Sequence, residues 1–331
     1  MADIQIYSSL EQKSAFFNHS DFWEINTKND LELWFKKYVS EFKKERPVDY
    51  IFRGMSDAKF KLFTSAQRCW IQDNMNQWRE NFTYFDFIKS LVNKAKNDHL
   101  IHRTFELYDY QHGEMDFPVL SLLQHYGAPT PLLDWSYNIK SAAFFAIDGV
   151  KRNLNAGNSV DNYMSVYSIH RKRQSKELLL LSDFNGGVYP SIDSFSGFGD
   201  ESNPHSNATF LISDFEDNGR VAYPHHRLTV SNHRKPYTSL FNQNIIPQEG
   251  LLMYNPFSDR PVEQLFNIRP DEGGWNLDLE QIRCFNIHKD LSEYLRRLLL
   301  DEGINHSYIY PHLYDNAKTI KESVLNAIVH I

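Results

Sequence analysis

Residues 124–136 read QHYGAPTPLLDWS and join two apolar segments of helical character. Residues 118–126, which overlap the start of this stretch, predict a short helix, because Gly127 suits the position just after the last turn of a helix. Two prolines within the stretch then require extended or turning backbone. A second apolar helix is expected over 139–146. We therefore expect the tightest part of the core in this region.

The chain upstream is expected to be mostly helical. Apolar residues recur at helical spacing over 31–42 and again over 71–100. Pro47 ends the first of these helices. Residues 50–52 are large and mainly apolar, and they predict a short buried strand that delivers Arg53 at its end.

Downstream of about residue 150 the periodicity changes and predicts a strand-rich half. The expected strands lie at 163–169, 210–212, 251–254 and 283–287. Residues 182–207 are rich in Ser, Asp, Asn, Gly and Pro, and they predict a surface loop or an insertion. Two further helices are expected at 291–299 and 317–329. Together these elements predict an α+β fold in which a helical N-terminal half packs on a small mixed or antiparallel sheet.

The composition is that of a folded protein. Hydrophobic residues make up 41% of the chain and aromatic residues 15%, which is too much for intrinsic disorder and enough for a large core. The chain has 35 Lys and Arg residues against 42 Asp and Glu residues, a net charge of −7. This charge argues against nonspecific binding of nucleic acid and leaves only a local basic groove open.

The sequence offers neither a disulfide framework nor a familiar metal site. Cys69 and Cys284 are the two cysteines, and their wide separation favours a reducing compartment. His225 and His226 would diverge on a strand, and no carboxylate completes a ligand spacing with them, so we expect no metal. No run approaches about 18 apolar residues, and the first residues lack the features of a signal peptide. We therefore expect a cytoplasmic protein with no membrane contact.

Two motifs carry a resemblance to a known family. The first is the FRG run at residues 52–54. The second combines 124–136 with the run AFFA at 143–146, and it is long and chemically unusual. Together the two motifs resemble the FRG domain, which takes its name from the first of them.

The resemblance also implies how the chain is organised. Weaker similarity at 64–68 and 303–313 extends it over about 48–325, which would form a single compact FRG-type unit with flanking helices. Residues 1–47 would then be an N-terminal helical extension, and 326–331 the end of a C-terminal helix. These boundaries are expectations that follow from the resemblance.

FRG relatives are prokaryotic proteins, and the resemblance implies a role in biological conflict, such as phage defence or toxicity. It does not name a substrate. The sequence departs from the family pattern at Met55, Pro131 and Asn244, where a polar or cationic residue is common. Each departure removes a group that could hold an anionic ligand.

Arg53 is the first candidate site residue. At the end of a buried strand, a planar guanidinium can hold a phosphate or a carboxylate, and Gly54 beside it lets a ligand approach closely. The alternative is structural: Arg53 pairs with a buried carboxylate such as Asp134 and fixes the fold. The residues alone leave both interpretations open.

The second motif supplies the other pocket candidates. Gln124, His125 and Tyr126 could converge with Arg53 on a polar pocket that fits a nucleotide. Alternatively, His125 donates a hydrogen bond to a backbone carbonyl in the turn after Gly127. Asp134 suits a general base or an acceptor for a ribose hydroxyl, and it equally suits a helix cap or a partner for an arginine.

Two functions remain open. The first is an enzyme that cleaves the glycosidic bond of NAD or a related nucleotide, in the manner of ADP-ribosyltransferase-like folds, with NAD as substrate rather than a bound cofactor. Such chemistry needs a cationic residue early in the chain, a hydroxyl and an aromatic ring in the middle, and a late acid. The matching residues, in that order of roles, are Arg53, Thr130 or Ser136, Tyr126, and Glu249 with Gln248 beside it; Asp134 is the second candidate acid.

The second function is a noncatalytic module that senses a ligand or binds a protein partner. The same pocket would recognise a nucleotide, a modified base or a phage component and would signal by changing shape. The departures at Met55, Pro131 and Asn244 favour this alternative. Two outcomes would discriminate: burial without a cleft would favour a scaffold, whereas an enzyme or a sensor is favoured by convergence on one open cleft of Arg53, Gln124, His125, Asp134 and Glu249.

Overall fold

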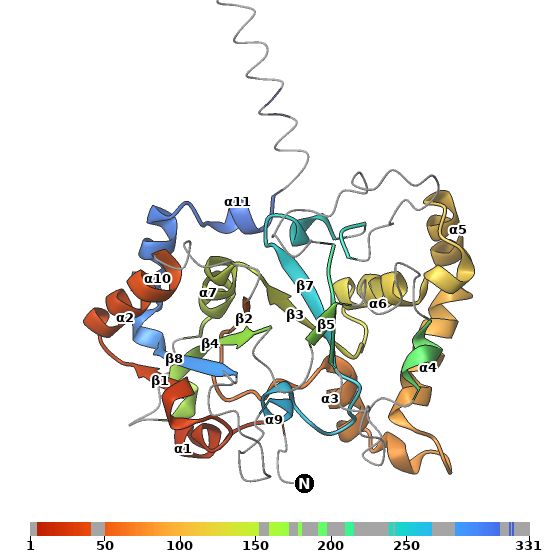
Figure 1. The fold of residues 1–331 in the computed structure, drawn as a ribbon, viewed down its shortest axis with the longest axis horizontal. Coiled ribbons are helices and arrows are strands. Elements are labelled where there is room, and N and C mark those ends of the chain that lie inside the picture. The colour runs from red at the N-terminus through yellow and green to blue at the C-terminus, as the bar shows by residue number, and fades with distance from the viewer. Residues whose placement is uncertain are drawn as a thin grey trace, which may run out of the picture.

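The computed structural model describes most of the chain, namely residues 5–40, 50–151, 159–171, 178–180, 191–196, 209–214, 238–240, 242–266 and 282–311, with Lys318 and Ile320. Over these residues the chain forms one mixed β-sheet with helices packed against it (Figure 1). The α+β fold and the mixed sheet expected from the sequence are confirmed.

The sheet of the described residues has eight strands. Their order across the sheet is β1 (Phe22–Ile25), β8 (Arg283–His288), β4 (Tyr163–His170), β2 (Tyr50–Met55), β3 (Leu132–Ser136), β7 (Gly250–Tyr254), β6 (Thr209–Ile212) and β5 (Leu178–Leu180). The outermost pairs, β1 with β8 and β5 with β6, are parallel, and every pair between them is antiparallel. The five strands expected from the sequence are confirmed, whereas β1, β3 and β5 were not anticipated as strands.

The helices lie between and around these strands. They are α1 (Leu10–Ser14), α2 (Lys28–Phe35), α3 (Ser65–Gln72), α4 (Tyr84–Lys96), α5 (His99–Leu107), α6 (Asp116–His125), α7 (Ile139–Ile147), α9 (Val262–Leu265), α10 (Ser292–Asp301) and α11 (His306–Ile309). The helices expected near 118–126, 139–146 and 291–299 are confirmed. The helix expected at 317–329 and most of the segment 182–207 lie outside the described residues.

The single long helix expected over 71–100 is wrong. Asn74 adopts a left-handed conformation with φ of 47°, which ends α3. Thr83 then starts α4 with a reciprocal capping box to Asp86, and Asp98 caps α5. Each cap satisfies backbone N–H groups that a continuous helix would have bonded internally, so three shorter helices replace one.

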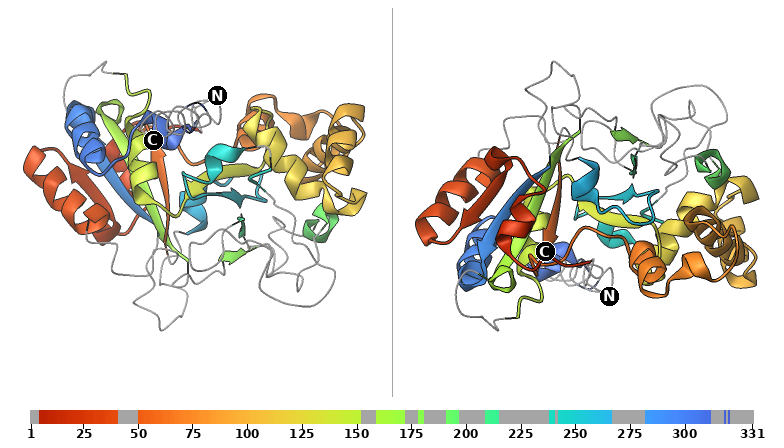
Figure 2. Two further views of the ribbon diagram at one scale, coloured as in Figure 1. Left: turned by 90° about the horizontal axis from the view of Figure 1, so that it is seen from above. Right: turned by 90° about the horizontal axis from the view of Figure 1, so that it is seen from below.

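Two groups of helices cover one face of the sheet at its two ends. Large apolar side chains of α2, α7 and α10 pack with Phe52 of β2. Side chains of α3, α4 and α6 pack with Leu132 of β3. Phe52 and Ser136 are directly paired across β2 and β3, and Leu132 lies on the same side of β3 as Ser136, so both groups rest on one face. The views in Figure 2 show these two helical groups apart from each other, with the strands between them.

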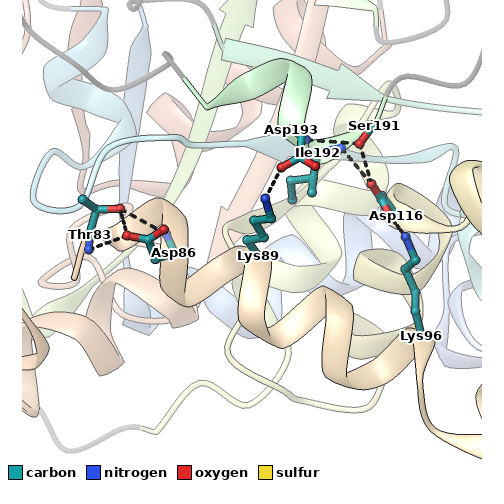
Figure 3. A network of polar contacts seen from close by, with 8 residues as sticks. All are labelled: Thr83, Asp86, Lys89, Lys96, Asp116, Ser191, Ile192 and Asp193. Atoms are coloured by element: carbon teal, nitrogen blue, oxygen red, sulfur yellow. Dashed lines mark hydrogen bonds and ion pairs between the residues drawn. The ribbon is translucent and has the colours of Figure 1, made fainter. Parts of the chain in front are cut away.

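A buried ion pair ties the second helical group together (Figure 3). Lys96 Nζ of α4 lies 2.5 Å from Asp116 Oδ1 of α6, and their side chains are only 7% and 3% exposed. The other oxygen of Asp116 accepts hydrogen bonds from Ser191 and from the backbone N–H of Ile192. The short 3-10 helix at Ile192–Phe195, inside the segment expected to be a loop, is thereby fixed against α4 and α6.

The N-terminal segment is not only helical, because β1 forms an edge strand beside β8. The division of the chain at residues 47 and 325 stays a prediction. No helix in the part of the chain described above is long and apolar enough to cross a membrane.

Candidate functional site

The candidate site lies where strands β2 and β3 separate. The two strands share a single register pair, Phe52 with Ser136. Beyond that pair the side chain of Arg53 reaches across, and its Nη1 donates a hydrogen bond to the backbone carbonyl of Asp134. The guanidinium therefore makes a contact that strand pairing would otherwise have made. The opening lies on the sheet between the two helical groups.

A chain of polar contacts links the two motifs. Arg53 Nη1 lies 4.0 Å from Asp134 Oδ2, and that same oxygen accepts a hydrogen bond from Gln124 Nε2 at 2.9 Å. Gln124 Oε1 in turn accepts a hydrogen bond from the buried hydroxyl of Thr130. The structure thus brings Arg53, Gln124 and Asp134 together although 81 residues separate the first from the last.

The electrostatics of Arg53 are unusual for an arginine. Its side chain is 16% exposed, and burial lowers the pKa of the guanidinium, an effect that the nearby Asp134 carboxylate opposes. A guanidinium carries five N–H donors, yet within the described residues the carbonyl of Asp134 is its one hydrogen-bond acceptor. The Asp134 side chain is 63% exposed, so it is not the buried partner of the structural alternative.

A cavity of about 330 Å³ opens beside Arg53. This cavity, called the Arg53 pocket below, is lined by Phe52, Arg53, Gly54, His125, Asp134, Trp135, Ser136, Phe145, Asn242, Asn244, Ile245, Gln248, Gly250, Leu251 and Tyr310. Its volume is at the lower end of the range for small-molecule sites. Six of the ten residues predicted from the sequence line it: Arg53, Gly54, His125, Asp134, Ser136 and Gln248.

Gly54 serves helix packing as well as lining the pocket. A Cβ built at this position would lie 1.9 Å from the backbone oxygen of Ala142 and 2.6 Å from the backbone nitrogen of Ala146. Only a glycine therefore lets β2 approach α7 this closely. The sequence interpretation, in which the glycine admits a ligand, missed this contact with the helix backbone.

His125 and Tyr126 occupy the end of α6. His125 lines the Arg53 pocket, and its ring makes no hydrogen bond within the described residues, so the expected bond to a turn carbonyl is absent there. Tyr126 is 75% exposed and packs edge-on against His125 with ring centroids 5.0 Å apart. Tyr126 and Thr130 do not line the pocket; Thr130 is fully buried and donates to Gln124.

Ser136 and Gln248 connect β3 to the turn before β7. Ser136 Oγ lies 2.6 Å from the carbonyl of Gln248 and accepts a hydrogen bond from the backbone N–H of Asn138. The Gln248 side chain donates to the carbonyl of Ile309 at 3.0 Å. Asn138, and not Asp134, caps α7, so the helix-cap interpretation of Asp134 is wrong. Asp134 lies inside β3 instead.

Glu249 lies outside the Arg53 pocket. It lines a neighbouring cavity of about 340 Å³ together with Asn138, Lys140 and Tyr308. Its carboxylate accepts a hydrogen bond from Asn138 Nδ2 at 3.1 Å, and burial raises its pKa. The backbone of Glu249 is left-handed, with φ of 48°. The structure therefore does not bring the predicted late acid into the cavity that holds Arg53.

Several lining residues were not predicted as site residues. Tyr310 follows α11, Phe145 belongs to the AFFA run, and Asn242 and Asn244 precede β7. In the sequence, Asn244 is visible only as a departure from the family pattern, and the region of Tyr310 only as a weak similarity. Within the described residues no three His, Cys, Asp or Glu side chains gather as metal ligands, and His225 and His226 lie outside those residues.

Comparison with known proteins relates part of the chain to a protein family. The FRG domain family model matches residues 48–154, which include β2, α6, β3 and α7 and with them Arg53, His125 and Asp134. No curated protein and no solved structure matches the chain. Both motifs lie in this segment and meet in the structure, so residues 48–154 are the part of the chain that is similar to the FRG domain family.

Proposed function

We propose that the Arg53 pocket binds a small phosphate-bearing molecule through the guanidinium of Arg53. The observation that carries this proposal is the shortage of acceptors around a largely buried cation. Within the described residues one backbone carbonyl accepts a hydrogen bond from it, and the carboxylate oxygen paired with it, at 4.0 Å, is beyond hydrogen-bond distance. Burying a charge is costly unless acceptors surround it. A phosphate in the pocket would accept the remaining N–H donors and offset that cost.

Cleavage of an N-glycosidic bond, as in NAD, is the second candidate function, and the position of Asp134 favours it. The carboxylate is exposed at the pocket and its orientation is fixed by Gln124. In such a reaction the bond between the ribose carbon and nicotinamide breaks, and its electron pair leaves with nicotinamide. The carboxylate stabilises the positive charge on the sugar until water adds there and loses a proton. Asp134 replaces Glu249 as the proposed acid, since Glu249 lines another cavity.

The alternative of a sensing module uses the same pocket without turnover. The position of Glu249 outside the pocket favours it, because the complete set of residues for glycosidic cleavage is not assembled there. A role in phage defence or toxicity, with a protein partner, belongs to this proposal on the strength of the family alone.

Calorimetric titration of the full chain with pyrophosphate, ADP and NAD tests the proposal. We expect saturable binding of at least one of these ligands, which the variant Arg53→Lys weakens. Arg103→Lys is the matched control, because Arg103 is 65% exposed on α5 and, within the described residues, pairs locally with Glu106. Incubation with NAD, followed by chromatography for nicotinamide, then separates an enzyme from a sensor. Absence of binding for all three ligands would contradict the proposal.

A further inference from the structure

We infer that the Arg53 pocket recognises a nucleoside phosphate, and that Phe145, Tyr310 and Asn244 hold its base. This inference rests on the proposed function, because it takes Arg53 as the phosphate-binding residue. It adds the chemical class of the rest of the ligand and assigns it to a second wall of the pocket. Of this wall, Phe145 belongs to the second motif and to the matched segment, whereas Tyr310 and Asn244 lie outside residues 48–154.

The wall has an aromatic component that is rigidly held. Phe145 comes from α7, and Tyr310 follows α11. Their ring centroids are 6.4 Å apart with the planes at 70°, which is the edge-to-face arrangement that aromatic pairs prefer. Tyr310 also contacts Phe144 at 6.3 Å and His306 at 4.9 Å. These contacts fix the Tyr310 ring before a ligand arrives, so stacking a base on it costs little ordering entropy.

The polar component of the wall consists of neutral amides. Asn242, Asn244 and Gln248 line the pocket, and Gln248 already donates to Ile309. The Asn244 side chain makes no hydrogen bond within the described residues. An amide presents a donor and an acceptor side by side, which matches the edge of a purine base. Asn244 therefore has both groups available to a ligand, and the buried Oδ1 of Asn242 likewise has no hydrogen-bond partner within the described residues.

The charges of the lining residues favour the same class of ligand. Among the lining residues that the structure describes, Arg53 is the one permanent cation and Asp134 the one carboxylate. A ligand with several phosphates and no base would find a single cation and a mostly neutral, aromatic surface. A nucleoside phosphate places its charge at Arg53 and its base against Tyr310 and Asn244. The departure from the family pattern at Asn244 then changes which ligand is held rather than only weakening an anion site.

The test compares ADP, ribose 5-phosphate and pyrophosphate by calorimetry. We expect the wild type to bind ADP at least about 10-fold more tightly than either other ligand. Tyr310→Leu should weaken ADP binding by about 10- to 100-fold, the range for loss of one base-stacking residue, and leave pyrophosphate binding unchanged. Asn244→Ala is the second variant. Asn244 lies on the turn before β7, and its substitution removes no aromatic packing. This variant should also weaken ADP binding and leave pyrophosphate binding unchanged. Tyr108→Leu, at an exposed ring directly after α5 and outside the pocket, should change the binding of neither ligand.

The outcomes separate this inference from the proposed function. Equal binding of ADP and pyrophosphate by the wild type, or a parallel loss of both in Tyr310→Leu and Asn244→Ala, would overturn the base-binding wall while the role of Arg53 stands. Loss of all binding in Arg53→Lys together with selective loss in the two wall variants would support both. No binding of any ligand by the wild type would contradict the proposed function, and the inference with it.

Discussion

Arg53 Nη1 donates a hydrogen bond to the backbone carbonyl of Asp134 and lies 4.0 Å from the carboxylate of the same residue. The carbonyl fixes the guanidinium, whereas the exposed carboxylate only partly compensates its charge. Asp134 thus contacts Arg53 in two ways. Its backbone carbonyl remains after any side-chain substitution, whereas its carboxylate charge can be removed by one. This arrangement makes the two roles of Asp134 separable by experiment.

Asp134→Asn should separate binding from turnover. The variant keeps the backbone carbonyl and an oxygen for Gln124, but it removes a negative charge near the anion site. Binding of pyrophosphate should therefore stay the same or strengthen. If the chain cleaves NAD, turnover should fall by a factor on the order of 100, as measured by nicotinamide release. Full turnover in the variant would exclude Asp134 as the acid.

Gly54→Ala should destabilise the fold strongly. The added methyl group would lie 1.9 Å from the Ala142 oxygen, and neither β2 nor α7 can move without disturbing the core. We expect a loss of about 3 kcal/mol or more in the free energy of unfolding, at or above the upper end for overpacking. Denaturant unfolding followed by circular dichroism measures it. Gly113→Ala is the matched control, since nothing lies within 4 Å of the added methyl group; equal stability of the two variants would contradict the packing argument.

Asp116→Ala should destabilise the second helical group (Figure 3). The substitution leaves the buried Lys96 ammonium without its carboxylate partner. It also removes the acceptor of the hydrogen bonds from the Ser191 hydroxyl and the Ile192 backbone N–H. Losing one partner of a buried pair costs about 3–5 kcal/mol. Lys89→Ala is the control from the same network: its ion pair with Asp193 is solvent-exposed, and we expect almost no change in melting temperature. A small effect of Asp116→Ala would show that the pair adds little to stability.

Glu249→Gln should raise stability at neutral pH. Burial raises the pKa of Glu249, so the ionised carboxylate destabilises the folded state at pH values above that pKa. The penalty shrinks once the pH falls below the folded-state pKa, because the folded protein then binds a proton that the unfolded chain still lacks, and it is gone below the unfolded-state pKa. The melting-temperature gain of Glu249→Gln should therefore be largest at pH 7–8 and shrink on acidification.

Glu302→Gln gives the opposite control for that experiment. Glu302 lines the same cavity but is paired with Lys140 at 2.5 Å, so its neutralisation should lower the melting temperature. A loss of stability in Glu249→Gln at neutral pH would contradict the burial argument. Binding in the Arg53 pocket should be unchanged in Glu249→Gln, since Glu249 does not line it.

The parts of the fold that the sequence predicts well have strong local signals. Gly127 has a positive φ of 77° and ends α6, and the apolar run at 139–146 forms a buried helix as expected. The error over 71–100 arose because apolar spacing continued through residues that cap new helices. The pair Thr83 and Asp86 was a readable capping signal, and it outweighs periodicity because it satisfies otherwise unpaired backbone donors.

The site was only partly predictable for a different reason. Arg53, Gln124 and Asp134 belong to recognisable motifs, so their meeting could be expected. Tyr310 enters the pocket from a segment that carries no periodicity, and its place depends on the packing of α11 and α7. Glu249 was expected there from its order along the chain, but order does not determine the direction of a side chain on a turn with left-handed backbone.

The affinity of ADP for Arg53→Lys, measured by calorimetry beside the melting temperature of the same sample, tests the central claim most directly. Lysine keeps the charge but loses the planar pair of donors that grips a phosphate. The account predicts a melting temperature close to that of the wild type and ADP binding weaker by about 10- to 100-fold, the loss expected for charge-assisted hydrogen bonds. A large fall in melting temperature with unchanged ADP affinity of the folded protein would contradict it and would make Arg53 a purely structural residue.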